Sequence, residues 1–169
     1  MSESGGIVAR DLAVNGVRIL NGERPVRDAF DELIALRSEP GEPNVVVIVD
    51  AEGLYEGLLT ARLLLRSLLA LWRPTRSIRE DVERFDEELL ELARERCVLP
   101  VRTVLVRGLP TAAPDDRLPT LIELACEERM EFLPVVEDRR LSGVVPIGRL
   151  FHTVASLALT PGDEGIHLK

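Results

Sequence analysis

Two stretches of the chain share one pattern: FLPVVEDRRLSGVVP at residues 132–146 and VVVIVDAEGLYEGLLT at residues 45–60. In each, a continuous apolar run is followed by polar residues and then by a second run that contains a glycine. Apolar runs of this length are typical of strands buried on both faces, and polar residues between two such runs predict a turn. Each stretch therefore predicts two adjacent β-strands, and the pattern occurs twice.

Helices are predicted on both sides of each strand pair. Apolar residues at spacings i, i+3, i+4 and i+7 indicate an amphipathic helix before it, while residues 61–72 and 147–159 form a closing helix after it. The stripe residues are Val26, Ala29, Phe30 and Leu33 in the first half and Leu118, Leu121, Ile122 and Ala125 in the second. Further upstream, VARDL (8–12) and VRI (17–19) correspond to VRTVL (101–105) and TAAPD (111–115). The order β-α-β-β-α is thus predicted twice, an α/β (α+β) fold.

The repeats divide the chain into four parts. Residues 7–72 form repeat 1, residues 73–97 an inserted amphipathic helix, residues 98–159 repeat 2 and residues 160–169 a loose tail. The inserted helix has an apolar seam with heptad spacing, too short for an independent coiled coil, so it must pack on its own module, on a dimer mate or on another protein. The seam residues are Ile78, Val82, Phe85, Leu89 and Leu92.

Composition and charge exclude several classes of protein. With 46% hydrophobic and 30% charged residues the chain is globular, and a net charge of −8 argues against nucleic-acid or anionic-membrane binding. The longest apolar run is about half a membrane span. Two cysteines in no CxxC pattern, and no signal peptide, indicate a reducing cytoplasm.

The sequence offers no catalytic or metal-binding constellation. No nucleophile elbow, phosphate loop, dinucleotide fingerprint or HExxH motif is present, and two histidines are too few for a histidine-rich metal site. Cys126 follows the stripe residue Ala125 and is predicted to be a buried, inert thiol. His152 is interpreted as a surface or packing residue. We expect a protein that is not an enzyme and has no resident metal or cofactor.

The repeated order of strand, helix, Leu-Pro-Val-Val, polar turn, glycine and helix resembles the CBS domain, and two copies in tandem resemble a Bateman module. The resemblance covers about residues 7–159 apart from the inserted helix. It implies two repeats packed as a pseudo-twofold pair with two clefts between them. In that family the clefts often bind AMP, ADP, ATP or S-adenosylmethionine, and modules often dimerise through their helices.

The family motif for ribose and phosphate, Gly-hydrophobic-hydrophobic-Thr/Ser-x-Arg-Asp, is only partly present. The first copy, GLLTARL (57–63), keeps Thr60 and Arg62 but has Leu63 in place of the aspartate. The second, GVVPIGR (143–149), has Pro146 in place of the hydroxyl and Arg149 in place of the aspartate. The resemblance thus implies ligand contacts by Thr60 and Arg62, and an unusual phosphate contact by Arg149. Thr60 alone also suits a helix N-cap.

Two functional hypotheses follow. In the first, the chain is a regulatory module that binds an adenine nucleotide or related ligand and changes a partner or its own homodimer packing. In the second, the missing aspartates and Pro146 indicate a ligand-free dimerisation or interaction scaffold, with an unidentified protein partner as a further option.

Overall fold

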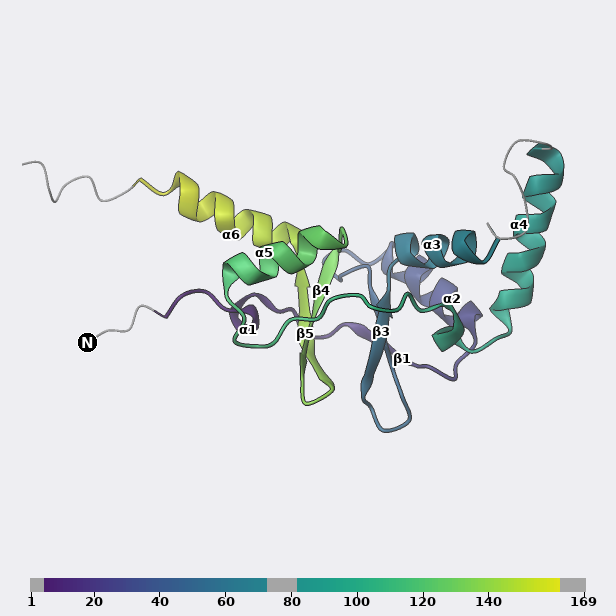
Figure 1. Cartoon of the computed structure of the whole chain (residues 1–169), viewed down its shortest axis with the longest axis horizontal. Helices are drawn as coiled ribbons and strands as arrows, with labels where there is room; N and C mark the ends of the chain where they lie inside the picture. Colours follow the sequence, from purple (N-terminus) through teal and green to yellow (C-terminus); the bar gives the residue numbers. More distant parts are fainter. Residues whose placement is uncertain (1–4, 73–81, 162–169) are drawn as a thin grey trace, which may run out of the picture.

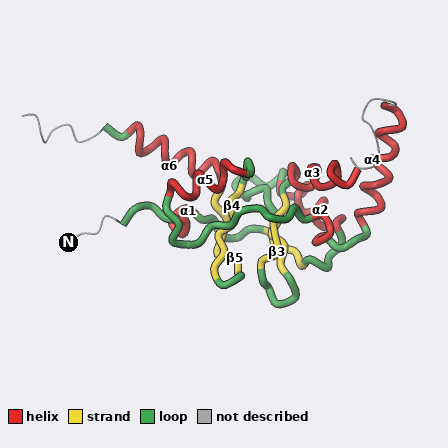
Figure 2. Tube along the Cα trace, viewed as in Figure 1, coloured by secondary structure: helices red, strands yellow, loops and turns green. Residues whose placement is uncertain are grey.

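The computed structural model describes residues 5–72 and 82–161, and the side chains of residues 82–85 lie outside this description. Within it the chain folds into six α-helices and two small sheets. Figure 1 shows the two strand pairs side by side in the middle of the molecule, with helices above them and the hairpin turns below. Figure 2 shows the same arrangement by secondary structure, with strands confined to the centre. This is the α+β architecture that the two sequence patterns predict.

The first half contains a three-stranded sheet. β1 (Arg18–Asn21) pairs in parallel with β2 (Val46–Val49), which pairs antiparallel with β3 (Tyr55–Leu59). A parallel pair needs a crossover connection, and α2 (Val26–Leu36) supplies it. α3 (Ala61–Trp72) follows β3 directly, with the bounds that the sequence predicts for the closing helix.

The second half contains a two-stranded antiparallel sheet. β4 (Phe132–Glu137) pairs with β5 (Arg140–Pro146), and these strands lie between α5 (Leu118–Glu127) and α6 (Ile147–Leu159). The leading strand predicted near residues 111–115 is reduced to an isolated parallel bridge that joins Ala112 to β4. Proline residues on both sides of this bridge, at positions 110, 114 and 134, have no N–H to donate, so the ladder cannot lengthen.

The short segments at the start of each repeat pack into the core of the other repeat. α1 (Ala9–Leu12) lies in the core of the second repeat, where Ala9 is fully buried. The 3-10 helix Val101–Val104, here η2, lies in the core of the first repeat, where both of its end residues are fully buried. The backbone N–H of Val101 donates to the Arg24 carbonyl at 2.7 Å. We call this arrangement the segment exchange; it joins the two repeats through their cores.

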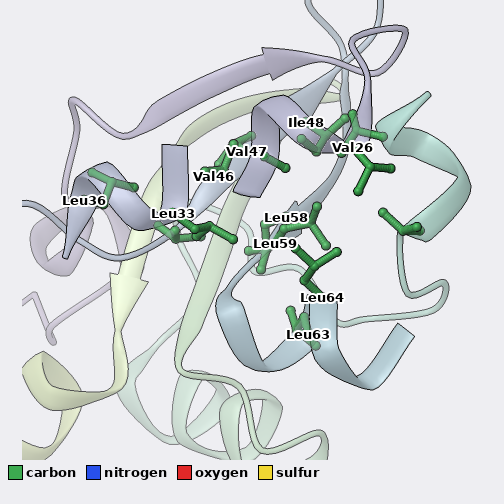
Figure 3. Close-up of a cluster of buried hydrophobic side chains, with 14 of the residues drawn as sticks. Val26, Leu33, Leu36, Val46, Val47, Ile48, Leu58, Leu59, Leu63 and Leu64 are labelled. Atoms are coloured by element: carbon green, nitrogen blue, oxygen red, sulfur yellow. The ribbon is translucent and has the colours of Figure 1, made fainter. Parts of the chain in front are cut away.

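The first core is assembled from the elements that carry the apolar patterns. Figure 3 shows Val46, Val47 and Ile48 of β2 facing Leu58 and Leu59 of β3. The side chains of residues 45–48 are fully buried, as expected for a strand covered on both faces. Because β3 runs straight into α3, this packing also fixes the start of that helix, where the candidate site lies.

The inserted helix forms α4 (Val82–Cys97) and contacts α2 and α3 of the same chain. Its seam residues Leu89 and Leu92 are half-buried, whereas Leu90 is 55% exposed. The predicted seam residue Ile78 and the side chains of Val82 and Phe85 lie outside the described part of the chain.

Candidate functional site

Thr60 occupies the junction between β3 and α3. Its side chain is 3% exposed, and its Oγ1 accepts a hydrogen bond from the backbone N–H of Leu63 at 3.2 Å. Its carbonyl accepts from the N–H of Leu64 at 3.0 Å. Thr60 is therefore the N-cap of α3, one of the two roles that the sequence leaves open for it. Among the described residues, nothing accepts the proton of this buried hydroxyl, which lines a cavity.

This cavity, of about 320 Å³, lies between the two repeats. Its lining combines apolar side chains with six charged ones and Thr60, and the first turn of α3 borders it. The apolar residues are Leu58, Leu63, Met130 and Phe132, and the charged ones are Arg62, Arg66, Glu127, Glu128, Arg129 and Glu131. We call it the Thr60 cavity. The size is at the small end of small-molecule sites, and most of the lining residues are charged or polar.

Arg62 connects the two repeats across this cavity. Its side chain is exposed, and its Nη1 donates to the backbone carbonyl of Arg129 at 3.3 Å. The sequence pairs Thr60 with Arg62 in one motif, and the structure brings both to the same cavity. Their contact with a ligand stays a prediction.

The opposite wall is built by the end of α5. The N–H of Met130 donates to the Ala125 carbonyl at 2.9 Å and the N–H of Arg129 to the Cys126 carbonyl at 3.4 Å, which is a Schellman motif. The motif places Arg129 at φ 52°, in the left-handed region where glycine is usual. It also buries Met130 and turns the Arg129 carbonyl toward Arg62. The end of this helix thus positions the second wall.

The sequence-based prediction missed five charged residues of the cavity. These are Arg66, Arg129 and the acidic members of the opposite wall, Glu127, Glu128 and Glu131. Their only local signal is a charged turn between an amphipathic helix and a strand. Because repeat packing alone brings this turn to α3, the sequence of one repeat cannot assign it to the site.

Arg149 lies apart from this cavity. It follows Pro146, which occupies the N-cap position of α6, and its Nη1 donates to the Leu12 carbonyl at 3.2 Å. Arg149 therefore contacts the end of the exchanged helix α1. The structure brings together two of the three predicted site residues and places the third at the segment exchange; a role for Arg149 in ligand binding stays a prediction.

A second cavity, of about 400 Å³, breaks the pseudo-twofold symmetry. It lies between the start of β3 and residues 102–109. At the equivalent place in the second half, Val14 pairs with Val144 of β5 through hydrogen bonds of 2.7 and 3.1 Å. Tyr55 lines the second cavity, and burial raises the pKa of its phenol well above its ordinary value.

Cys126 contradicts its prediction. It is exposed, because the buried stripe of α5 is formed by Leu121 and Ala125, and the next residue along the helix is rotated about 100° away from it. In the part of the chain that the structure describes, no group of three or more His, Cys, Asp or Glu residues could hold a metal ion. Within the same residues no helix is long and apolar enough to cross a membrane.

Comparison with solved structures identifies the fold. A CBS domain-containing protein of unknown function from Kribbella flavida matches with a TM-score of 0.57 and 21% identity, over 89% of this chain and 100% of that chain. CBSX2, solved in complex with AMP, matches with a TM-score of 0.64 and 17% identity, over 90% of this chain and 99% of that chain. The cytosolic domain of the Mg²⁺ channel MgtE, solved in complex with ATP, matches with a TM-score of 0.60 and 16% identity, over 86% of this chain and 48% of that chain.

These likenesses show that the chain has the fold of a tandem CBS-domain pair, which confirms the resemblance drawn from the two strand patterns. No protein-family model matches the sequence. No curated protein matches it either.

Proposed function

We propose that this CBS-domain pair is a non-catalytic regulatory module of the cytoplasm that binds an adenine nucleotide in the Thr60 cavity. The observation that carries the proposal is the buried Thr60 hydroxyl, whose proton has no acceptor among the described residues, at the N-terminus of α3. The positive end of a helix and its free amide groups attract phosphate, and the Arg62 guanidinium lies beside them. Structural neighbours of the same fold hold AMP or ATP, which supports this ligand class.

The position of Arg62 indicates how a ligand could act on the module. Its bond to the Arg129 carbonyl joins the two repeats at the mouth of the cavity. A phosphate group would compete with a neutral carbonyl for this cation, since hydrogen bonds between two charged groups are the stronger ones. Binding would then replace a contact between the repeats by a contact with the ligand.

The test is thermal unfolding of the purified protein with AMP, ADP, ATP and S-adenosylmethionine. A nucleotide at about a hundredfold excess over its Kd adds about 2.7 kcal/mol to the free energy of unfolding. This raises Tm by about 5–11 °C for a chain of this size. Arg62→Ala should weaken this shift, whereas Arg27→Ala, which removes an exposed arginine from α2, should leave it unchanged. No shift with any of the four ligands at millimolar concentration would refute the proposal.

A second observation favours self-association. α6 buries only Leu150 in its own chain, while Phe151 is 75% and Leu157 is 59% exposed. α6 contains no Asp, Glu or Lys, and its one arginine, Arg149, donates to the Leu12 carbonyl, so two copies of an acidic chain can meet there without bringing carboxylates together. We propose that the module forms a homodimer through this face. Such a dimer is also what the alternative, a ligand-free scaffold, requires.

Light scattering tests the interface. Phe151→Asp should halve the particle mass, while His152→Asp, on the polar side of the same helix, should leave it unchanged. If Phe151→Asp keeps the mass of the wild type, α6 is not the interface. A dimer that binds no nucleotide would support the scaffold alternative.

A further inference from the structure

The two walls of the Thr60 cavity carry opposite charge. The wall from the first repeat has the N-terminus of α3 with Arg62 and Arg66. The wall from the second repeat has the C-terminal end of α5 with Glu127 and Glu128, and Glu131 follows. Helix termini reinforce this difference, because the N-terminus of a helix is partially positive and its C-terminus partially negative. Arg129 is the only cation on the acidic wall.

The carboxylates of the acidic wall are not neutralised by the arginines of the cavity. Within the described residues, no ion pair joins Arg62, Arg66 or Arg129 to any of the three glutamates. All three glutamates are exposed, and they place three formal negative charges around the opening. Three arginines and three glutamates give the lining a formal charge of zero.

We infer that this arrangement makes the cavity select adenosine monophosphate over the triphosphate, an inference that rests on the proposed function. One phosphate satisfies the positive pole, which consists of the α3 N-terminus, Thr60 and Arg62. A cavity of about 320 Å³ is at the small end of ligand sites, so two further phosphates extend to the rim, where the carboxylates stand. On that wall three carboxylates stand beside one cation, Arg129, so each added negative charge meets more repulsion than attraction.

The size of the effect follows from Coulomb's law. Two unit charges about 8 Å apart in water change a binding constant by about a factor of two, and salt reduces this further. ATP carries about two more negative charges than AMP, and the acidic wall, with three glutamates and Arg129, acts on each of them with a net formal charge of −2. We therefore expect AMP to bind at least about threefold more tightly than ATP, the reverse of the order in a site lined by cations alone.

Isothermal titration of the full chain with AMP, ADP and ATP tests this order. The measurement is made with EDTA and again with Mg²⁺, because Mg²⁺ bound to ATP could bridge to a carboxylate. The triple variant Glu127→Gln, Glu128→Gln and Glu131→Gln should shift the ratio of AMP affinity to ATP affinity by about fivefold toward ATP. The matched control Glu137→Gln removes one exposed carboxylate at the far end of β4 and should leave the preference unchanged.

The possible outcomes separate this inference from the proposed function. If no nucleotide binds to the wild type, the proposed function fails and the charge selection fails with it. If nucleotides bind and ATP binds as tightly as AMP or more tightly with EDTA, where no Mg²⁺ can bridge, the charge selection alone is overturned. If AMP is preferred but the triple variant keeps the full preference, the carboxylates do not cause it and the inference is likewise overturned.

Discussion

Replacing Leu12 by alanine tests whether the segment exchange makes the two repeats one cooperative unit. Leu12 belongs to α1, at the start of the first repeat, yet it is only 8% exposed and lies in the core of the second repeat. The substitution removes three buried carbon atoms, which lowers the free energy of unfolding by about 2.4 kcal/mol. The cavity left behind raises this loss to about 3 kcal/mol. For a chain of this size Tm should fall by about 6–12 °C.

Two fluorescent probes can follow each repeat separately. Trp72, the only tryptophan, lies at the end of α3 in the first repeat and is 4% exposed. Cys126 is exposed on α5 of the second repeat and can carry a fluorophore once Cys97 is replaced by serine. In urea, both probes should report one midpoint, and Leu12→Ala should lower that midpoint for both equally at fixed protein concentration.

The outcome that would refute the reasoning is a divergence of the probes. If Leu12→Ala shifts the Cys126 transition and leaves the Trp72 transition in place, the repeats unfold independently and the segment exchange does not couple them. Leu65→Ala is the matched control, because it makes the same chemical change at a side chain that is 63% exposed on α3. It should change the free energy of unfolding by no more than about 0.5 kcal/mol.

Three further predictions concern single side chains. Thr60→Val should lose about 1 kcal/mol of helix capping while Thr60→Ser keeps it; equal urea midpoints for the two variants would contradict the N-cap role. Because burial raises the pKa of Tyr55, its contribution to stability is present below about pH 10 and is lost as the pH rises further. Tyr55 is the only tyrosine, so absorbance at about 295 nm reports the ionisation of this one side chain. Phenolate should form only at a pH where circular dichroism shows that the chain has unfolded. Phenolate at pH 10 in a folded chain would contradict this prediction. Arg149→Ala should lower the free energy of unfolding by about 0.5–1.5 kcal/mol, because it removes the hydrogen bond to the Leu12 carbonyl. In contrast to Arg62→Ala, it should leave the affinity for AMP unchanged. A weaker affinity for AMP would instead assign Arg149 to the ligand site.

The parts of the fold that depend on local pattern were predictable from the sequence. The closing helices at Ala61–Trp72 and Ile147–Leu159 have the predicted bounds, because Thr60 and Pro146 mark where each strand must give way to a helix. The strand pairs were predictable too, since buried strands appear as continuous apolar runs. The first strand of the second repeat, expected near residues 111–115, is wrong, because neighbouring prolines limit it to one bridge.

What the sequence could not predict depends on how the repeats pack. VARDL and VRTVL have similar patterns, so either segment suits either core, and only the packing assigns each to the opposite repeat. The acidic wall of the Thr60 cavity was missed for the same reason. Cys126 shows the limit within one helix, since a residue next to a buried stripe residue already faces solvent.

The segment exchange also has a consequence for the order in which the chain can fold during synthesis. α1 leaves the ribosome before the core that it packs into, and its partner Arg149 is 137 residues further along the chain. At about 5–20 residues per second, α1 waits about 7–27 s for that partner to be made. The first repeat waits as well, because its core includes Val101, Val104 and Val144. Neither half can complete its core as it emerges, so the nascent chain has to keep apolar surface from both repeats uncovered until the start of α6 has been made.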